Sequence, residues 1–198
     1  MSVGSFLHAK PRPEAVGPTS APASLTLPDE PVSVHRTFGF LDLCGFTEYV
    51  ERVGAAEAVE CLASFRELAR KVTSRQGVRI AKWLGDGVML VGVEGGPMTA
   101  AAVELTARVD EPLKLRAGLA SGSCLLFEGD DYIGKPANLA ARLCDVARPA
   151  EVLADANTGL LSPEWVEVGP PMTRKISSLG RVRGLVSLGL APGVALPA

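Results

Sequence analysis

Two aspartates follow short apolar runs and could share a metal ion. Asp42 stands near the end of the apolar stretch 38–43, and Asp86 stands in the glycine-flanked turn of AKWLGDGVML, residues 81–90. If the two runs are neighbouring strands, both carboxylates meet at one edge of a sheet. Two carboxylates without a nearby histidine suit hard cations such as Mg²⁺ or Mn²⁺. The alternative is two unrelated turn acids, because Asp86-Gly87 is also a common hairpin turn.

A second candidate pair is Asn138 and Arg142. They are four residues apart in a segment, 136–147, that is expected to be a helix, so they lie on one face about one turn apart. An amide beside a guanidinium suits a ribose and a phosphate whose charge grows in a transition state. A solvated helix face is the alternative. Against it, the neighbours in ANLAA are small and apolar, so an asparagine that opens a helix against a sheet indicates a function for its amide.

The stretch EGDDYIGKPANLAAR contains an apparent phosphate-binding loop that we reject. Gly129, Gly134 and Lys135 match the first seven positions of G-x-x-x-x-G-K-[ST]. Pro136 then replaces the Ser or Thr that would bind magnesium, and it also removes a backbone amide. Two aspartates inside the loop would repel a triphosphate. The backbone amides of residues 44–47, which precede an expected helix, are better candidates for binding phosphate oxygens.

The composition excludes several classes of function. The chain has 198 residues and a net charge of -2, which gives no overall attraction to nucleic acid or to an acidic membrane. Four widely spaced cysteines and two histidines argue against a zinc cluster, a disulfide framework and a histidine-based nucleophile. No apolar run approaches the ~18 residues of a membrane span, and no secretory signal is visible. We therefore expect a cytoplasmic protein that binds neither nucleic acid nor membrane.

The order of expected elements predicts an α+β fold. Residues 1–34 are proline-rich and are expected to be a disordered arm, residues 35–191 the folded domain, and residues 192–198 a C-terminal tail. Within the domain we expect a strand ending near residue 43, a helix ending at Gly77, a hairpin over 78–93 and a helix over 97–109. A strand pair kinked at Gly122, a helix over 136–147, a strand over 151–155 and two strands within 172–190 follow. Strand pairs alternating with helices on one face indicate a ferredoxin-like α/β sandwich.

Four stretches together resemble the class III nucleotidyl cyclase catalytic domain, the adenylyl and guanylyl cyclase homology domain, in its compact bacterial adenylyl cyclase type. They are FLDLCGFT, KWLGDGVML, LRAGLASG and DYIGKPANLAARL, in the order of that family, and the resemblance covers residues 36 to 190. It implies the fold of that domain. It also implies conversion of ATP to cyclic AMP and pyrophosphate by attack of the ribose 3′-hydroxyl on the α-phosphate.

The resemblance also assigns roles to single residues. Asp42 and Asp86 resemble the aspartates that hold two Mg²⁺ or Mn²⁺ ions per site, one activating the 3′-hydroxyl and the other neutralising the triphosphate. Lys82 and Asp131 match the lysine and the acid that select adenine. The remaining matches are Asn138 for ribose orientation, Arg142 for transition-state charge, and Arg181 or Arg183 for the triphosphate. Gly45, Phe46 and Thr47 are phosphate-binding candidates through their amides at the start of the expected helix.

In the family, each site is shared between two protomers, so a chain carrying the full set implies a head-to-tail homodimer that is inactive as a monomer. Two other functions stay open: a guanylyl or dual-specificity cyclase, and a weakly active cyclase-like module that binds nucleotide and regulates a partner. Three residues depart from the family pattern: Trp83, Ala137 and Ala150. We expect these departures to affect rate and affinity more than reaction type.

Overall fold

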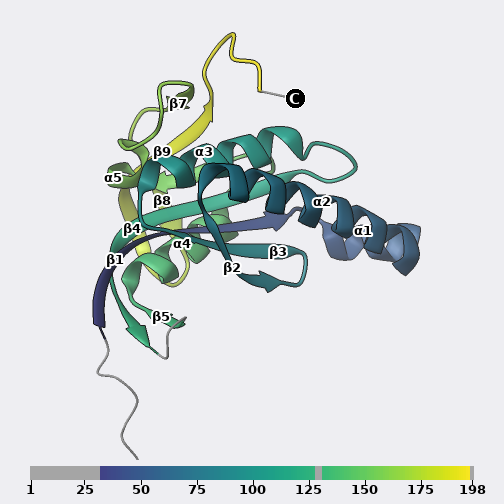
Figure 1. Cartoon of the computed structure of the whole chain (residues 1–198), viewed down its shortest axis with the longest axis horizontal. Coiled ribbons are helices and arrows are strands. Elements are labelled where there is room, and N and C mark those ends of the chain that lie inside the picture. The colour runs from purple at the N-terminus through teal and green to yellow at the C-terminus, as the bar shows by residue number, and fades with distance from the viewer. Residues whose placement is uncertain (1–31, 128–130, 197–198) are drawn as a thin grey trace, which may run out of the picture.

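The computed structural model describes residues 32–127 and 131–196 (Figure 1). Almost all of the expected arm, residues 1–34, lies outside these ranges, as do residues 197–198 of the tail and Gly129 and Asp130 of the rejected loop. No helix within the described ranges is long and apolar enough to cross a membrane.

The described strands form one mixed sheet. Its order is β2-β3-β1-β4-β6-β9-β7, with β5 paired to β4 and β8 paired to β9. The long central strands β1 and β4 are antiparallel, and β4 and β6 are parallel. The strands are β1 (Val32–Leu43), β2 (Arg79–Leu84), β3 (Gly87–Gly92), β4 (Leu115–Phe127), β5 (Asp131–Ile133), β6 (Val152–Asp155), β7 (Val166–Val168), β8 (Met172–Ile176) and β9 (Gly180–Leu190).

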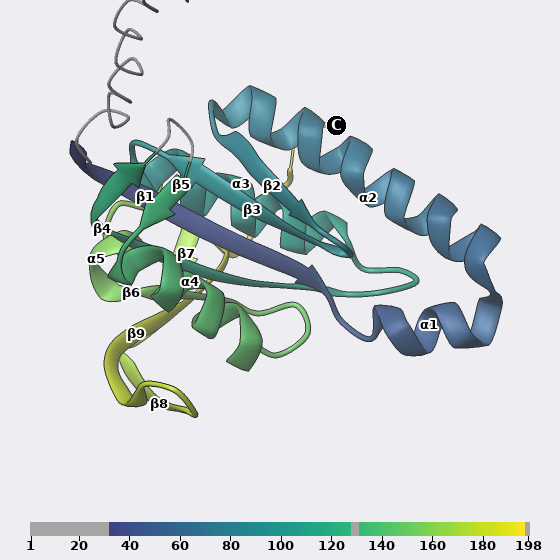
Figure 2. The same cartoon turned by 90° about the horizontal axis from the view of Figure 1, so that it is seen from below.

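Helices cover both faces of the sheet, so the expectation of helices on one face was wrong. The long helices α2 (Ala55–Gln76) and α3 (Gly95–Arg108) lie on one face, and α4 (Lys135–Val146) lies on the other (Figure 2). The physical reason is the alternation in β1. Leu41 and Leu43 join the core beneath α2 and α3, whereas Phe38 joins a second core beneath α4.

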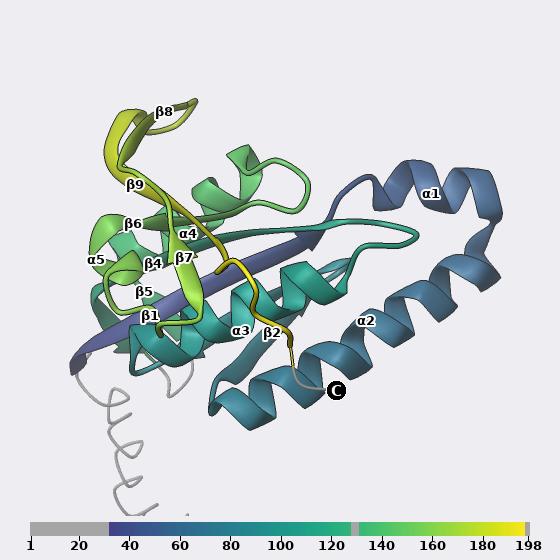
Figure 3. The ribbon, with the colours of Figure 1, turned by 90° about the horizontal axis from the view of Figure 1, so that it is seen from above.

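Several short elements differ from expectation. Helix α1 (Phe46–Val53) precedes α2 and lies beyond the end of β1 (Figure 3), and the short α5 (Ala156–Gly159) follows β6. Strand β4 is continuous through Gly122, so the expected kinked strand pair is one long strand. The hairpin loop is Gly85-Asp86, one residue earlier than expected, because Leu84 pairs with Gly87. Gly85 has a φ of 68°, and a positive φ at the first loop position is typical of a type II′ turn.

One glycine sets how closely α4 approaches the sheet. A Cβ at Gly118, in the middle of β4, would collide with the backbone of α4 at Ala140 and Cys144. Helix α4 carries Asn138 and Arg142, so this close approach also sets the position of both candidate residues. Backbone atoms on both sides leave little freedom to relax.

We therefore expect Gly118→Ala to destabilise the protein by about 3 kcal/mol, because overpacking would separate α4 from β4. The matched control is Gly189→Ala in β9, where an added Cβ meets no atom within 4 Å, and we expect a change within about 0.5 kcal/mol. Urea unfolding of the two variants measures both values. Equal stability of the two variants would contradict this packing.

Candidate active site

Asp42 lies where three strands meet. In β1 it is opposite Gly87 of β3 on one side and Arg116 of β4 on the other. A Cβ on Gly87 would lie 2.8 Å from the Leu41 carbonyl oxygen and 3.3 Å from Oδ1 of Asp42. The absence of a side chain at residue 87 therefore leaves room for the Asp42 carboxylate beside the hairpin.

Asp86 is brought to the same edge by the hairpin loop. Partial burial is the main reason that its pKa is raised above the usual value, and the negative charge of Asp42 raises it further. A backbone hydrogen bond and the charge of Arg116 oppose these effects. Asp42 is opposite Gly87, the residue after Asp86, so the strand pairing places both aspartates at one edge. Metal binding by the two carboxylates stays a prediction.

Arg116 is the residue of this edge that the sequence reasoning missed. Its Nη2 and Nε donate to Oδ2 of Asp42 at 2.6 and 3.0 Å, and its Nη1 donates to the Asp145 carbonyl at 3.2 Å. The pair is partly exposed, with 29% of each side chain accessible. The available signal was a lone arginine among the apolar residues of LKLRAGLA, but only the register of β1 against β4 shows that it faces Asp42.

A small cavity of about 160 Å³ adjoins this edge and is lined by Asp42, Gly87, Cys144 and Asp145 among others. Burial raises the pKa of the Cys144 thiol to about 12, so in the metal-free protein this group is protonated at neutral pH, and a thiol is a softer ligand than the oxygen donors that Mg²⁺ prefers. The hard oxygen ligands at this edge are therefore the carboxylates.

The two residues expected to select adenine lie in contact. Nζ of Lys82, on β2, is 2.6 Å from Oδ1 of Asp131, on β5, and about half of each side chain is exposed. A β-bulge lies between Ile80 and Lys82. Ile80 packs into the core beneath α2, whereas Lys82 is paired with Met89, which belongs to the core beneath α4. The bulge thus turns Lys82 to the α4 face.

Asn138 and Arg142 lie on the exposed side of α4, as their spacing predicted. Helix α4 packs on the sheet through Ala137 and Ala140, whereas Asn138 is exposed, so the alternative of a solvated helix face stays open. Nη1 of Arg142 is 2.8 Å from Oδ2 of Asp145. Asn138 lines a cavity of about 570 Å³ between α4, β4 and the β8–β9 hairpin.

One of the residues expected to bind phosphate is excluded by the structure, and the others remain candidates. The Cys44 amide donates to the Lys114 carbonyl at 2.8 Å, so including Cys44 among the phosphate-binding amides was wrong. Gly45, with a φ of 76°, precedes α1, and no side chain of the described residues caps that helix. The amides of Gly45, Phe46 and Thr47 remain candidates. Arg181 is exposed on β9, which lies three strands away from β1 in the sheet order.

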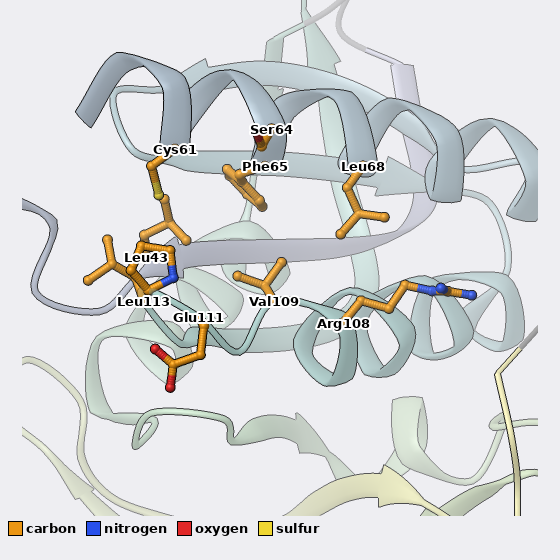
Figure 4. A pocket seen from close by; sticks show the side chains of 10 residues that line it. Leu43, Cys61, Ser64, Phe65, Leu68, Arg108, Val109, Glu111 and Leu113 are labelled. Atoms are coloured by element: carbon orange, nitrogen blue, oxygen red, sulfur yellow. The ribbon is translucent and has the colours of Figure 1, made fainter. Parts of the chain in front are cut away.

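The cavity in Figure 4 lies away from the residues described above. It has a volume of about 240 Å³ and lies beneath α2, where Cys61, Phe65 and Leu68 face Val109 and Leu113 from the segment that joins α3 to β4. None of the residues expected to bind metal or nucleotide lines it. We assign it no part in the candidate site.

The edge residues fit a divalent cation. Within the described ranges no three His, Cys, Asp or Glu side chains cluster as a complete metal site. Asp42 and Asp86 supply two carboxylates, and Mg²⁺ is commonly bound by one or two carboxylates with water and substrate phosphates completing its coordination. The donor set is therefore that of a site completed by a phosphate-bearing ligand.

Comparisons of sequence agree with this chemistry. No protein-family model matches the chain. It is 38% identical over 151 residues to a pH-sensitive adenylate cyclase of Mycobacterium tuberculosis, covering 71% of this chain and 38% of the relative. It is 34% identical over 132 residues to an adenylate cyclase of Streptomyces coelicolor, covering 64% of this chain and 34% of the relative. The chain thus spans well under half of the length of these relatives.

Comparisons of structure identify the fold. The adenylyl cyclase CyaB of P. aeruginosa superposes with a TM-score of 0.72 at 22% identity, over 83% of this chain and 98% of that one. The catalytic core of a rhodopsin-guanylyl cyclase with converted specificity, in complex with ATPαS, gives 0.70 at 17% identity, over 82% and 99%. The described chain has the fold of a class III nucleotidyl cyclase catalytic domain, and its sequence is similar to those of bacterial adenylate cyclases, as expected.

The raised pKa of Asp86 gives a prediction about stability. Ionised Asp86 destabilises the folded protein, a penalty that is absent below the pKa of an unfolded aspartate and complete above the raised value. Without divalent cations, we expect Asp86→Asn to raise Tm at neutral pH and to lose this advantage as pH falls through the carboxylate range.

The measurement is thermal unfolding in a chelator across that pH range. Asp110→Asn is the control, because the Asp110 side chain is 68% exposed and lies on the loop after α3. A lower Tm for Asp86→Asn than for wild type at neutral pH would show that ionised Asp86 does not destabilise the folded protein.

Proposed function

We propose that this chain is the catalytic domain of an adenylyl cyclase, which converts cytoplasmic ATP to cyclic AMP and pyrophosphate. The observation that carries the proposal is the convergence of Asp42 and Asp86 at one strand edge, with Gly87 leaving the space beside them. Its sequence relatives named adenylate cyclases and its fold support the same reaction class.

Asp42 and Asp86 would hold the divalent cations. Bound Mg²⁺ or Mn²⁺ would supply a Lewis acid that lowers the pKa of the ribose 3′-hydroxyl and neutralises the triphosphate. The 3′-oxygen forms a bond to the α-phosphorus, the bond to the β-phosphate oxygen breaks, and pyrophosphate leaves. The hydroxyl proton passes to solvent, so no protein base is required.

Arg116 is our addition to the triphosphate contacts. Its guanidinium holds Asp42 in place and lies at the same edge, so it can exchange part of its carboxylate contact for phosphate oxygens. The amides of Gly45, Phe46 and Thr47 at the start of α1 would bind further phosphate oxygens. Arg181 remains a candidate from a second protomer.

Lys82 and Asp131 would recognise adenine. The ammonium group of Lys82 can donate to a ring nitrogen, and the carboxylate of Asp131 can accept from the exocyclic amino group. Their 2.6 Å ion pair is half exposed, so adenine can replace it at low cost. Guanine presents an oxygen where adenine has the amino group, and that oxygen would meet the Asp131 carboxylate.

Asn138 and Arg142 would act on the site of a second protomer. Both project from the outer side of α4, where Asn138 can orient the ribose and Arg142 can stabilise charge on the α-phosphate. A head-to-tail homodimer would bring these residues to the Asp42–Asp86 edge of the partner and form two shared sites.

The direct test is formation of cyclic AMP and cyclic GMP by purified protein supplied with ATP or GTP and Mn²⁺. We expect cyclic AMP as the main product, no product from Asp86→Asn, and a loss on the order of a hundredfold from Arg142→Ala. Cyclic GMP as the main product would favour a guanylyl cyclase. No product from a folded dimer would favour a nucleotide-binding regulatory module.

Complementation tests the shared site. Alone, Asp42→Ala should be inactive and Arg142→Ala should keep about a hundredth of the activity. Mixing them should restore activity, because each heterodimer contains one site with all residues intact. We expect up to a quarter of wild-type activity per protein, since half of the dimers are mixed and half of their sites are intact. If differently tagged variants co-purify as heterodimers and the mixture stays inactive, the shared-site arrangement is wrong.

A further inference from the structure

Strand β2, which carries Lys82, packs against helix α2 on the face of the sheet opposite to Lys82. Trp83 follows Lys82 in β2 and packs into the core beneath α2. Its ring meets Phe65 edge-on at 6.3 Å between centroids, and the guanidinium carbons of Arg66 and Arg70 lie 5.0 and 5.4 Å from its centre. Trp83, one of the departures from the family pattern, is therefore a platform for two arginines one turn apart.

Arg66 makes a second contact that Arg70 does not. Its Nη2 donates to the carbonyl oxygen of Gly85 at 2.9 Å. Gly85 is the first residue of the hairpin loop, and Asp86 is the second. A single side chain of α2 thus joins the Trp83 ring to the backbone next to the candidate metal ligand.

The buried Nε of Arg66 has no hydrogen-bond partner among residues 32–127 and 131–196. An unpaired buried donor lowers stability. The Trp83 ring and the Gly85 carbonyl therefore determine the position of the guanidinium, although Nε stays unpaired there. A side chain held in this way indicates that its position matters for the loop.

Gly85, the first residue of the hairpin loop, has little packing against the described part of the chain. A Cβ on Gly85 would meet nothing within 4 Å, and Leu84 is 47% exposed. At the same time, repulsion from Asp42 favours movement of Asp86 away from the edge. The Arg66 contact opposes that movement from the other face of the sheet.

We propose that Arg66 is a positioning residue that fixes the hairpin loop on the Trp83 platform and so holds Asp86 beside Asp42 for cation binding. This proposal rests on the proposed function, because it assigns a cation to the two aspartates. Under this proposal, Arg66 and Trp83 influence metal affinity although they lie on the α2 face of the sheet and contact neither nucleotide nor cation.

The test compares Arg66→Met with Arg70→Met. Both variants lose a guanidinium over Trp83, but only Arg66→Met loses the hydrogen bond to Gly85. We expect Arg66→Met to raise the Mn²⁺ concentration for half-maximal activity about tenfold, a typical cost for residues that orient metal ligands, and to keep kcat at saturating Mn²⁺. Arg70→Met should stay within about twofold of wild type, since it retains the loop contact. Equal effects of the two variants, or a loss of kcat without a change in Mn²⁺ dependence, would overturn the proposal.

Hydrogen exchange of the metal-free protein separates this proposal from the proposed function. We expect amides of the hairpin loop to exchange at least tenfold faster in Arg66→Met and at the wild-type rate in Arg70→Met. Unchanged loop exchange in Arg66→Met would refute the positioning role, whether or not the protein is a cyclase. If loop exchange is faster in Arg66→Met but the wild-type protein forms no cyclic nucleotide, the positioning role of Arg66 stands and the proposed function is wrong.

Discussion

The repulsion between Asp42 and Asp86 is the constraint on which this edge of the molecule depends. Partial burial and, to a lesser extent, the charge of Asp42 raise the pKa of Asp86, so the ionised carboxylate raises the free energy of the metal-free fold. Arg116 offsets part of it by binding Asp42 from β4. Gly87 leaves the space in which the Asp42 carboxylate fits. The surrounding structure thus holds together two charges that would separate without it.

The two faces of the sheet carry different parts of the candidate site. The α4 face carries Lys82 and the edge cavity, while the α2 face carries Trp83 and its arginines. A strand can present different side chains to the two faces because its residues alternate, and the bulge before Lys82 changes which residue faces which side. A change beneath α2 can therefore alter the positions of Lys82 and Asp86, the residues proposed to contact adenine and the cation, from the opposite face of the sheet.

The sequence predicted the features that depend on local pattern. Apolar alternation and glycine punctuation identified the main strands and helices, and the spacing of Asn138 and Arg142 placed both on one helix face. Arg116 was missed because strand register is a tertiary property: nothing in LKLRAGLA states that its arginine lies opposite Asp42. The bulge at β2 was missed for the same reason. The loop was placed one residue late because Asp-Gly and Gly-Asp both form tight turns, and the pairing of Leu84 with Gly87 selects the second.

The most direct test of this account is a crystal structure with Mn²⁺ and a non-cyclisable ATP analogue, with the cation located by its anomalous scattering. The account predicts Mn²⁺ between the carboxylates of Asp42 and Asp86 at about 2.2 Å, with phosphate oxygens completing its coordination. A cation bound elsewhere, with the Asp42–Arg116 pair unchanged and Asp86 facing solvent, would contradict it.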